Sequence, residues 1–138
     1  MVRVQKGLGL ATGGAIACAL AALVTPAAAQ APGMKALDGL EKGQWQVRFR
    51  SSEPARSICV RTGRELLQLR HRQGGCNRFV VEGGANSVTV QYKCPGNGYG
   101  RTNIRRESAR LVQIDSQGIE GGLPFQSSAE ARRTGACR

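Results

Sequence analysis

The chain is poor in the residues that build active sites and metal centres. It has one histidine, His71, among 138 residues. Metal clusters normally use several histidines or closely spaced cysteines, and a hydroxyl nucleophile needs a histidine base. His71 stands between Arg70 and Arg72, which make it a poor base, and no Gly-x-Ser-x-Gly elbow is present. We therefore predict no catalytic residue, no metal and no cofactor, and we expect His71 to be a solvated residue at the end of a short helix.

Carboxylates are scarce as well. The chain has nine acidic residues against 20 basic ones, and no two of those within the part expected to fold form a close pair in the sequence. Glycoside hydrolysis requires two carboxyl groups a few ångströms apart. The pattern therefore argues against an enzyme. A hydrolase whose carboxylates converge only in three dimensions remains an alternative.

The first 29 residues have the three parts of a secretory signal peptide. A basic start, Arg3 and Lys6, precedes an uncharged apolar stretch over 8–24, and small residues follow. We predict cleavage after Ala29, no transmembrane segment in the mature chain, and a periplasmic or secreted protein. Acylation at Cys18, as in a lipoprotein, is a minor alternative because the preceding residues lack a large apolar side chain three positions upstream.

The mature chain has the size of one small domain with a thin core. Residues 30–42 are small and polar and are expected to form a flexible tether, with a helical turn around 35–41. Residues 43–138 are expected to form a single β-rich domain. Aromatic residues make up only 4% of the chain, so covalent cross-links are expected to support the core.

Four cysteines remain after the predicted cleavage: Cys59, Cys76, Cys94 and Cys137. An even number of cysteines in an exported chain predicts disulfides. No pair has the close spacing that is typical of a zinc site. Three connectivities are open on the count alone.

A predicted hairpin selects one connectivity. Two β-prone runs, 77–82 and 87–93, flank a turn-rich centre. One register of this hairpin pairs Glu82 with Ser87, and a slip of one residue pairs Glu82 with Val88. The slipped register also places Val80 opposite Val90 and Cys76 opposite Cys94, which is close enough for a disulfide. We therefore predict the bridges Cys76–Cys94 and, by elimination, Cys59–Cys137.

The remaining pattern is one of short strands and turns. Apolar and polar side chains alternate over 44–50, which predicts a strand with one buried face. Thr62 and Glu65 form a capping box that predicts a helix of about two turns over 63–70. The glycine-rich stretch 118–124 is expected to be a loop. Together these features predict a mainly β fold: an antiparallel meander of about six or seven strands, able to curl into a half-barrel, with one short helix and two disulfides.

The formal charge is +11, and loss of Arg3 and Lys6 with the signal reduces it to +9. Such a charge indicates anionic partners such as lipid head groups, lipopolysaccharide or acidic polymers. The most concentrated basic group is expected to fall close together in a hairpin with its turn at 107–109, and it forms our candidate anion-binding set: Arg101, Arg105, Arg106 and Arg110. Tyr99 is expected on one face with Arg101, Asn103 and Arg105, and an open sheet face with aromatic and arginine side chains can bind nucleic acid or acidic glycans. The scatter of the other arginines makes nucleic acid an unexpected partner and leaves a merely solvated basic surface as the alternative.

The order of several short motifs resembles a known family. Gly-Gln-Trp opens a strand at 43–45, Cys59 ends the next strand, Cys76 and Cys94 bracket a hairpin, and Gly-Ala-Cys closes the chain at 135–137. In this order they resemble the domain-of-unknown-function 3617 family, small exported proteins of Gram-negative bacteria. The resemblance covers residues 40–138 and implies a periplasmic location without implying an activity.

We therefore expect a periplasmic, disulfide-stapled domain that binds a partner or supports the envelope without catalysis. A cationic binder of anionic envelope components, acting through the arginine-rich sheet face, is the first alternative. The hydrolase is the second.

Overall fold

Seven antiparallel strands form one open sheet in the computed structural model, which describes residues 32–138. The strands are β1 (Gly43–Phe49), β2 (Arg56–Val60), β3 (Asn77–Gly83), β4 (Ser87–Cys94), β5 (Gly98–Ser108), β6 (Leu111–Glu120) and β7 (Leu123–Gly135). This confirms the predicted mainly β fold. The predicted cleavage after Ala29 and the alternative acylation of Cys18 lie outside the described residues.

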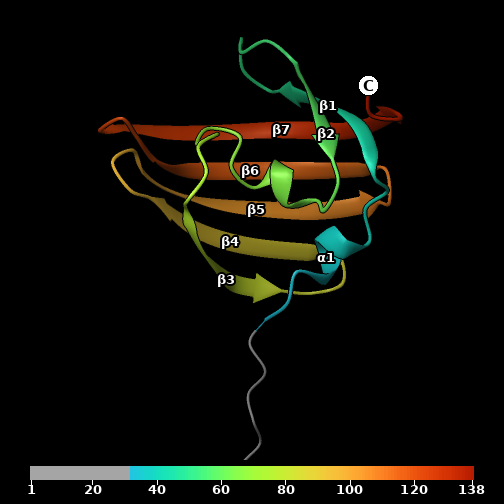
Figure 1. Ribbon diagram of the computed structural model, residues 1–138, viewed down its shortest axis with the longest axis horizontal. Coiled ribbons are helices and arrows are strands. Elements are labelled where there is room, and N and C mark those ends of the chain that lie inside the picture. Colours follow the sequence, from blue (N-terminus) through green and yellow to red (C-terminus); the bar gives the residue numbers. More distant parts are fainter. Residues whose placement is uncertain (1–31) are drawn as a thin grey trace, which may run out of the picture.

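The two edge strands of the sheet, β2 and β3, follow one another in the sequence. The order across the sheet is β2-β1-β7-β6-β5-β4-β3, so β3 to β7 form a meander and the β1–β2 hairpin joins it through β7. The connection from β2 to β3 must therefore pass from one edge to the other. Figure 1 shows this segment, residues 61–76, lying across one face of the sheet. We call it the crossover, the face that it covers the inner face, and the opposite face the outer face.

The crossover contains less helix than the sequence pattern predicts. It holds a single 3-10 turn, η1 (Arg64–Leu66), in place of two helical turns over 63–70. The capping interaction itself forms, because the backbone N–H of Thr62 donates to the Glu65 carboxylate at 3.2 Å. The chain then leaves the helical path, and all three leucines of this segment are buried. Tertiary packing here overrides the local helical pattern.

The core lies between the inner face and its cover. Trp45 and Val47 of β1 are fully buried there, as the alternation over 44–50 predicts. The short helix α1 (Lys35–Asp38) also belongs to this core, because Leu37 is only 1% exposed. Burial of a leucine is worth roughly 2 kcal/mol. The second half of the predicted tether, 30–42, is therefore part of the folded domain.

Both predicted disulfides are present. Cys76 and Cys94 are joined with their Cα atoms 4.3 Å apart, and Val80 lies opposite Val90 as the predicted register requires. Cys59 and Cys137 are joined with their Cα atoms 5.4 Å apart. The first bridge closes the β3–β4 hairpin, and the second ties the edge strand β2 to the end of the chain.

The β3–β4 hairpin also contains a β-bulge that the sequence pattern did not predict. Val81 is the extra residue, so Glu82 lies opposite Thr89 and not opposite Val88. A bulge sets two residues of one strand against one of its partner. Here it brings the Glu82 carboxylate to 3.4 Å from the Thr89 hydroxyl. The predicted pairing of Glu82 with Val88 is wrong, while the register on the disulfide side is confirmed.

The stretch predicted as a loop over 118–124 is mostly strand. β6 and β7 continue until Glu120 pairs with Leu123, and only two residues form the turn. Gly121 and Gly122 have φ angles of 56° and 83°, a conformation that glycine adopts without steric cost. A two-residue turn with both φ angles positive closes a hairpin tightly.

Candidate functional site

The four arginines predicted to form one anion-binding set do not gather in one place. Arg101 and Arg105 point to the outer face of β5, because residues four positions apart in a strand share a face. Arg106 follows directly and therefore lies on the inner side, opposite the buried Val112. Arg110 lies in the turn between β5 and β6. Strand alternation thus separates a set that is continuous in the sequence.

Most of these arginines already have partners. Arg105 and Arg110 form ion pairs with nearby glutamates at 2.9 and 3.6 Å. Arg106 donates to the carbonyl oxygen of Ala85 at 3.0 Å. Of the four, Arg101 alone makes no ion pair or side-chain hydrogen bond with the described part of the chain.

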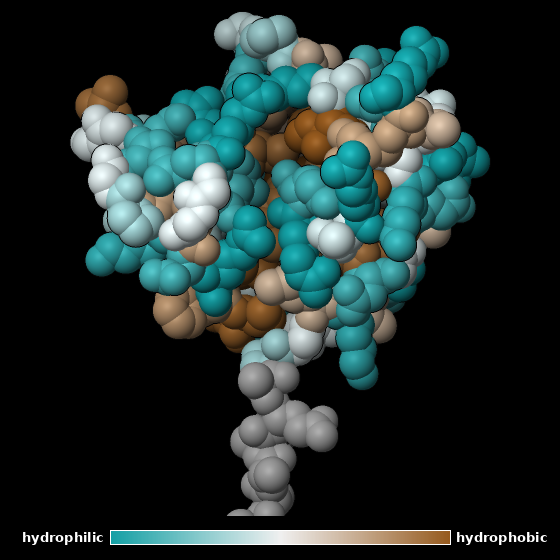
Figure 2. Space-filling view, viewed as in Figure 1, coloured by the Kyte–Doolittle hydropathy of each residue, from teal (hydrophilic) through white to brown (hydrophobic). Residues whose placement is uncertain are grey.

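A different set of arginines lines a pocket of about 350 Å³ between the two edges of the sheet. Its walls come from β2, the crossover and the start of β3. The charged residues of its lining are four arginines and one carboxylate: Arg56, Arg64, Arg72, Arg78 and Glu65. We call it the arginine pocket. Figure 2, viewed from the crossover side, shows hydrophilic residues around hollows with apolar residues at their base.

Two of these guanidinium groups are held in place by hydrogen bonds to neutral oxygens, and Arg56 also forms an ion pair with Glu53. Arg56 donates from Nη1 to the carbonyl oxygen of Leu69 at 2.7 Å and lies over the ring of Phe49, 4.8 Å from its centroid. Arg78 donates from Nε to the Oε1 atom of Gln68. Hydrogen bonds to carbonyl and amide oxygens fix a guanidinium without neutralising its charge. Arg78 therefore brings an unneutralised positive charge to the pocket, while the charge of Arg56 is partly compensated by Glu53.

The other two arginines have weaker partners or none within residues 32–138. Arg64 donates to the carbonyl oxygen of Thr62 at 3.5 Å and has a long contact with Asp38, 3.8 Å. The Arg64 and Asp38 side chains are both substantially exposed, so this ion pair contributes little. Arg72 is exposed and makes no ion pair within residues 32–138. Both side chains can reorient toward a ligand at low cost.

The single carboxylate of the pocket is already engaged. Glu65 accepts hydrogen bonds from the backbone N–H groups of Arg61 and Thr62, each at 3.2 Å. Burial acts to raise the pKa of Glu65, but hydrogen bonds from backbone N–H groups outweigh it and lower that pKa overall. The negative charge of Glu65 thus serves the turn of the crossover and not the arginines.

Positive charges outnumber negative charges in the lining of the pocket. Burial lowers the pKa of Arg56, and repulsion by Arg72 and Arg70 lowers it further, while Glu120 acts in the opposite direction. An arginine nevertheless stays protonated in proteins. Guanidinium groups that repel one another at a concave surface are stabilised when an anion binds between them.

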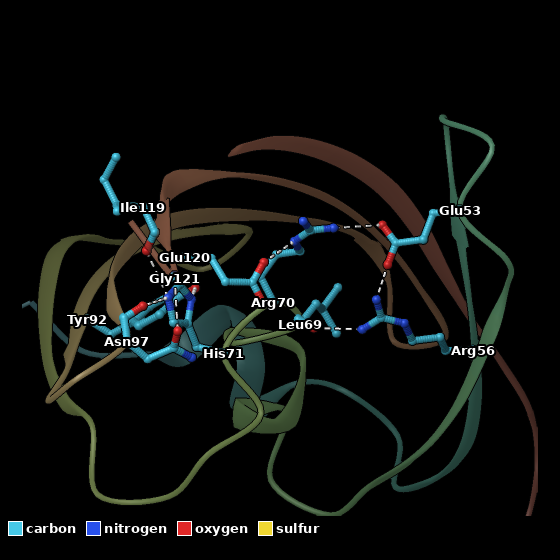
Figure 3. A network of polar contacts seen from close by, with 10 residues as sticks. All are labelled: Glu53, Arg56, Leu69, Arg70, His71, Tyr92, Asn97, Ile119, Glu120 and Gly121. Carbon is cyan, nitrogen blue, oxygen red and sulfur yellow. Dashed lines mark hydrogen bonds and ion pairs between the residues drawn. The ribbon is translucent and has the colours of Figure 1, made fainter. Parts of the chain in front are cut away.

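A network of ion pairs borders the pocket. Glu53 contacts both Arg56 and Arg70, and Arg70 also donates from Nε to Glu120 at 3.1 Å. Figure 3 shows Arg70 between the two carboxylates, and its guanidinium lies over Phe125, 5.5 Å from the ring centroid. Two carboxylates therefore converge in three dimensions, as the hydrolase alternative requires. Arg70 occupies the space between them, so they are its ion-pair partners.

His71 is fully buried, with 0% exposure, and the prediction of a solvated residue is wrong. Its Nε2 lies 2.9 Å from the carbonyl oxygens of both Asn97 and Ile119, and its Nδ1 lies 3.0 Å from the Tyr92 hydroxyl. Carbonyl oxygens only accept, so Nε2 carries the proton and Nδ1 accepts from Tyr92 in the neutral ring. Gly100, opposite Tyr92, leaves room for that hydroxyl, since a Cβ there would meet it at 2.3 Å. Both ring nitrogens of His71 are thus hydrogen-bonded to groups inside the fold.

Further polar groups join the crossover to the sheet. The Thr102 hydroxyl donates to the carbonyl oxygen of Leu67 at 2.8 Å and lies 2.8 Å from the Ser116 hydroxyl. Burial raises the pKa of Tyr92, although the hydrogen bond with Ser116 acts against it, so Tyr92 remains protonated and able to donate. These contacts anchor the wall of the arginine pocket.

Residues 32–138 contain neither a cluster of metal ligands nor a membrane-spanning helix. No three histidine, cysteine, aspartate or glutamate side chains there come together as a metal site would require. No helix in the same range has the length and hydrophobicity needed to cross a membrane.

Comparison with known proteins gives no match: no family model, no curated protein and no solved structure is significantly similar to this chain. The resemblance to the domain-of-unknown-function 3617 family therefore stays a prediction from its motifs. The function must be inferred from the geometry of the chain itself. The sequence carried no local signal for the arginine pocket, because strands at opposite edges of the sheet supply its residues.

Proposed function

We propose that the chain is an exported, non-catalytic binding protein that holds an anionic ligand in the arginine pocket. The observation that carries this proposal is the excess of positive charge in a concave site. Four guanidinium groups line a pocket of about 350 Å³, of which Arg56 pairs with Glu53 at its border, and backbone N–H groups engage Glu65, the one carboxylate of the lining. A pocket of this size suits a small molecule or a head group. Arginine is also the side chain best suited to bind phosphate and carboxylate groups through paired N–H donors.

The ligand class follows from this chemistry. Phosphate and carboxylate groups occur in phospholipid head groups, lipopolysaccharide and acidic polymers, which are the anionic envelope components expected from the sequence. The two disulfides are compatible with an oxidising compartment outside the cytoplasm. The periplasmic location and the envelope ligand form part of the proposal.

The first test is a calorimetric titration of the oxidised protein with pyrophosphate and with vesicles that contain an anionic phospholipid. We expect binding at low salt that weakens as ionic strength rises. The double variant Arg72→Ala/Arg78→Ala should bind at least about a hundredfold more weakly, because each of the two lost charge-assisted hydrogen bonds is worth about 1.5–3 kcal/mol. Both side chains are exposed, so the variant is expected to fold.

The matched control is Arg101→Ala/Arg105→Ala, which removes the same net charge from the outer face. It should change the affinity by less than about twofold if the pocket is the site. Equal weakening by the two double variants would show that net charge, not the pocket, attracts the anion. The proposal is overturned if neither pyrophosphate nor the anionic vesicles bind at low salt.

A further inference from the structure

A line of side chains crosses five strands on the outer face. Phe79 of β3 lies opposite Gln91 of β4, which lies opposite Arg101 of β5, and the pairing continues through Gln117 of β6 to Gln126 of β7. Directly opposed residues in antiparallel strands point to the same face. At about 4.8 Å per strand the line is about 19 Å long. We call these five residues the glutamine row.

The polar side chains of the row have no partners inside the described part of the chain. Gln91, Arg101, Gln117 and Gln126 make no side-chain hydrogen bond or ion pair within residues 32–138. The row therefore presents three amides and one guanidinium to the outside. Each amide offers both a donor and an acceptor.

The neighbouring row of the outer face, Thr89, Asn103, Asp115 and Ser128, is hydrogen-bonded internally. Asn103 donates to the Thr89 hydroxyl at 2.9 Å, and the Ser128 hydroxyl donates to Asp115 at 2.5 Å. These side chains satisfy one another across the strands. The outer face thus has a row that is hydrogen-bonded internally beside one whose groups are available.

The row also lies in a hollowed part of the face. Arg101 and Gln117 line two adjoining hollows of about 320 and 340 Å³. The second hollow is also lined by Tyr99, which is 48% exposed, and Phe79 at the end of the row is 64% exposed. Both rings are therefore available to a ligand that lies along the row.

We propose that the glutamine row binds an extended oligosaccharide. Sugar hydroxyls both donate and accept hydrogen bonds, as the amides do, and the apolar face of a sugar ring packs on an aromatic ring such as Phe79 or Tyr99. A row with a single positive charge does not fit a polyanion, since nucleic-acid grooves combine aromatic residues with many cations. The occupant is therefore a neutral or sparsely acidic glycan. This site lies on the face opposite the crossover and does not depend on the arginine pocket.

The test begins with an array of neutral and acidic oligosaccharides and continues by calorimetry with the extended oligosaccharide that binds best. Phe79→Ala and Gln117→Ala should each weaken binding about tenfold. A rise from about 50 to about 300 mM NaCl should change the affinity less than about threefold, because only one cation takes part. Both side chains are exposed, so these variants should keep the fold.

Two controls separate this proposal from the previous one. Gln73→Ala removes an exposed glutamine from the crossover, and Arg72→Ala/Arg78→Ala disables the arginine pocket. Neither should weaken oligosaccharide binding. The inference is overturned if no oligosaccharide on the array binds, or if Phe79→Ala and Gln117→Ala bind as the unchanged protein does. It is also overturned if single-stranded DNA binds more tightly than any oligosaccharide and with a steep salt dependence.

Discussion

Replacement of both Cys59 and Cys137 by serine is expected to lower the free energy of unfolding by about 4.5 kcal/mol. The bridge joins residues 78 positions apart, so its loss gives the unfolded chain much additional freedom. It also holds the β1–β2 hairpin, which pairs with the rest of the sheet only through β1 and β7. Since a domain of this size is stable by only about 5–15 kcal/mol, the loss is a large fraction of the total.

Urea unfolding under non-reducing conditions, followed by the fluorescence of the buried Trp45, measures this effect. The matched comparison is Cys76→Ser/Cys94→Ser, whose bridge spans only 18 positions and is expected to contribute about 3 kcal/mol. The larger loss should follow removal of Cys59–Cys137. A loss below about 1 kcal/mol for that pair would contradict a structural role for the long bridge.

Replacement of His71 by alanine is expected to cost about 4 kcal/mol. The substitution leaves the Tyr92 hydroxyl and the carbonyl oxygens of Asn97 and Ile119 without their partner in the interior. Each unsatisfied buried group costs about 1–3 kcal/mol, and the cavity adds to this. The same urea experiment measures the loss.

Two variants bracket this result. Tyr92→Phe removes only the hydroxyl that His71 contacts, so a smaller loss of about 1 kcal/mol is expected. Arg72→Ala changes an exposed neighbour of His71 and should have almost no effect on stability. If His71→Ala were as mild as Arg72→Ala, the histidine would be solvated, as its sequence neighbours suggested.

The parts of the fold that the sequence predicted are those set by local patterns. The alternation over 44–50 and the turn-rich centre of the β3–β4 hairpin fixed which residues face inward, and the hairpin register then placed Cys76 beside Cys94. With Cys76 and Cys94 paired, Cys59 and Cys137 were the only two cysteines left to pair among the four expected in the mature chain. The bulge at Val81 was not predictable, because almost all of β3 is exposed and no alternation of buried and exposed residues marks an inserted residue there.

The errors at the candidate site have two different origins. Arg105 and Arg106 are adjacent in a strand, so alternation alone could have shown that they point to opposite faces. The burial of His71, by contrast, depends on carbonyl groups that the turn before β5 and the end of β6 bring together. Arg70 and Arg72 suggested an exposed histidine. The burial of His71 is instead set by residues that are distant in the sequence and close in space.

Long-range topology explains why both proposed sites needed the structure. Arg56 and Arg78 come from opposite edges of the sheet and meet only because the crossover fills the gap between them. The glutamine row needs the register of four successive strand pairs. A shift of one residue in any of them would move the following side chains to the other face.

The central claim is that an anion binds in the arginine pocket, and the most direct measurement of it is an NMR titration of the 15N-labelled, oxidised protein with pyrophosphate. The backbone amide signals of residues 56–58 and 64–73, together with the backbone and Nε–H signals of Arg78, should shift in a saturable way. The signals of Arg101 and Arg105 on the outer face should stay in place. Shifts that centre on Arg101 and Arg105, or no saturable shift at low salt, would contradict the claim.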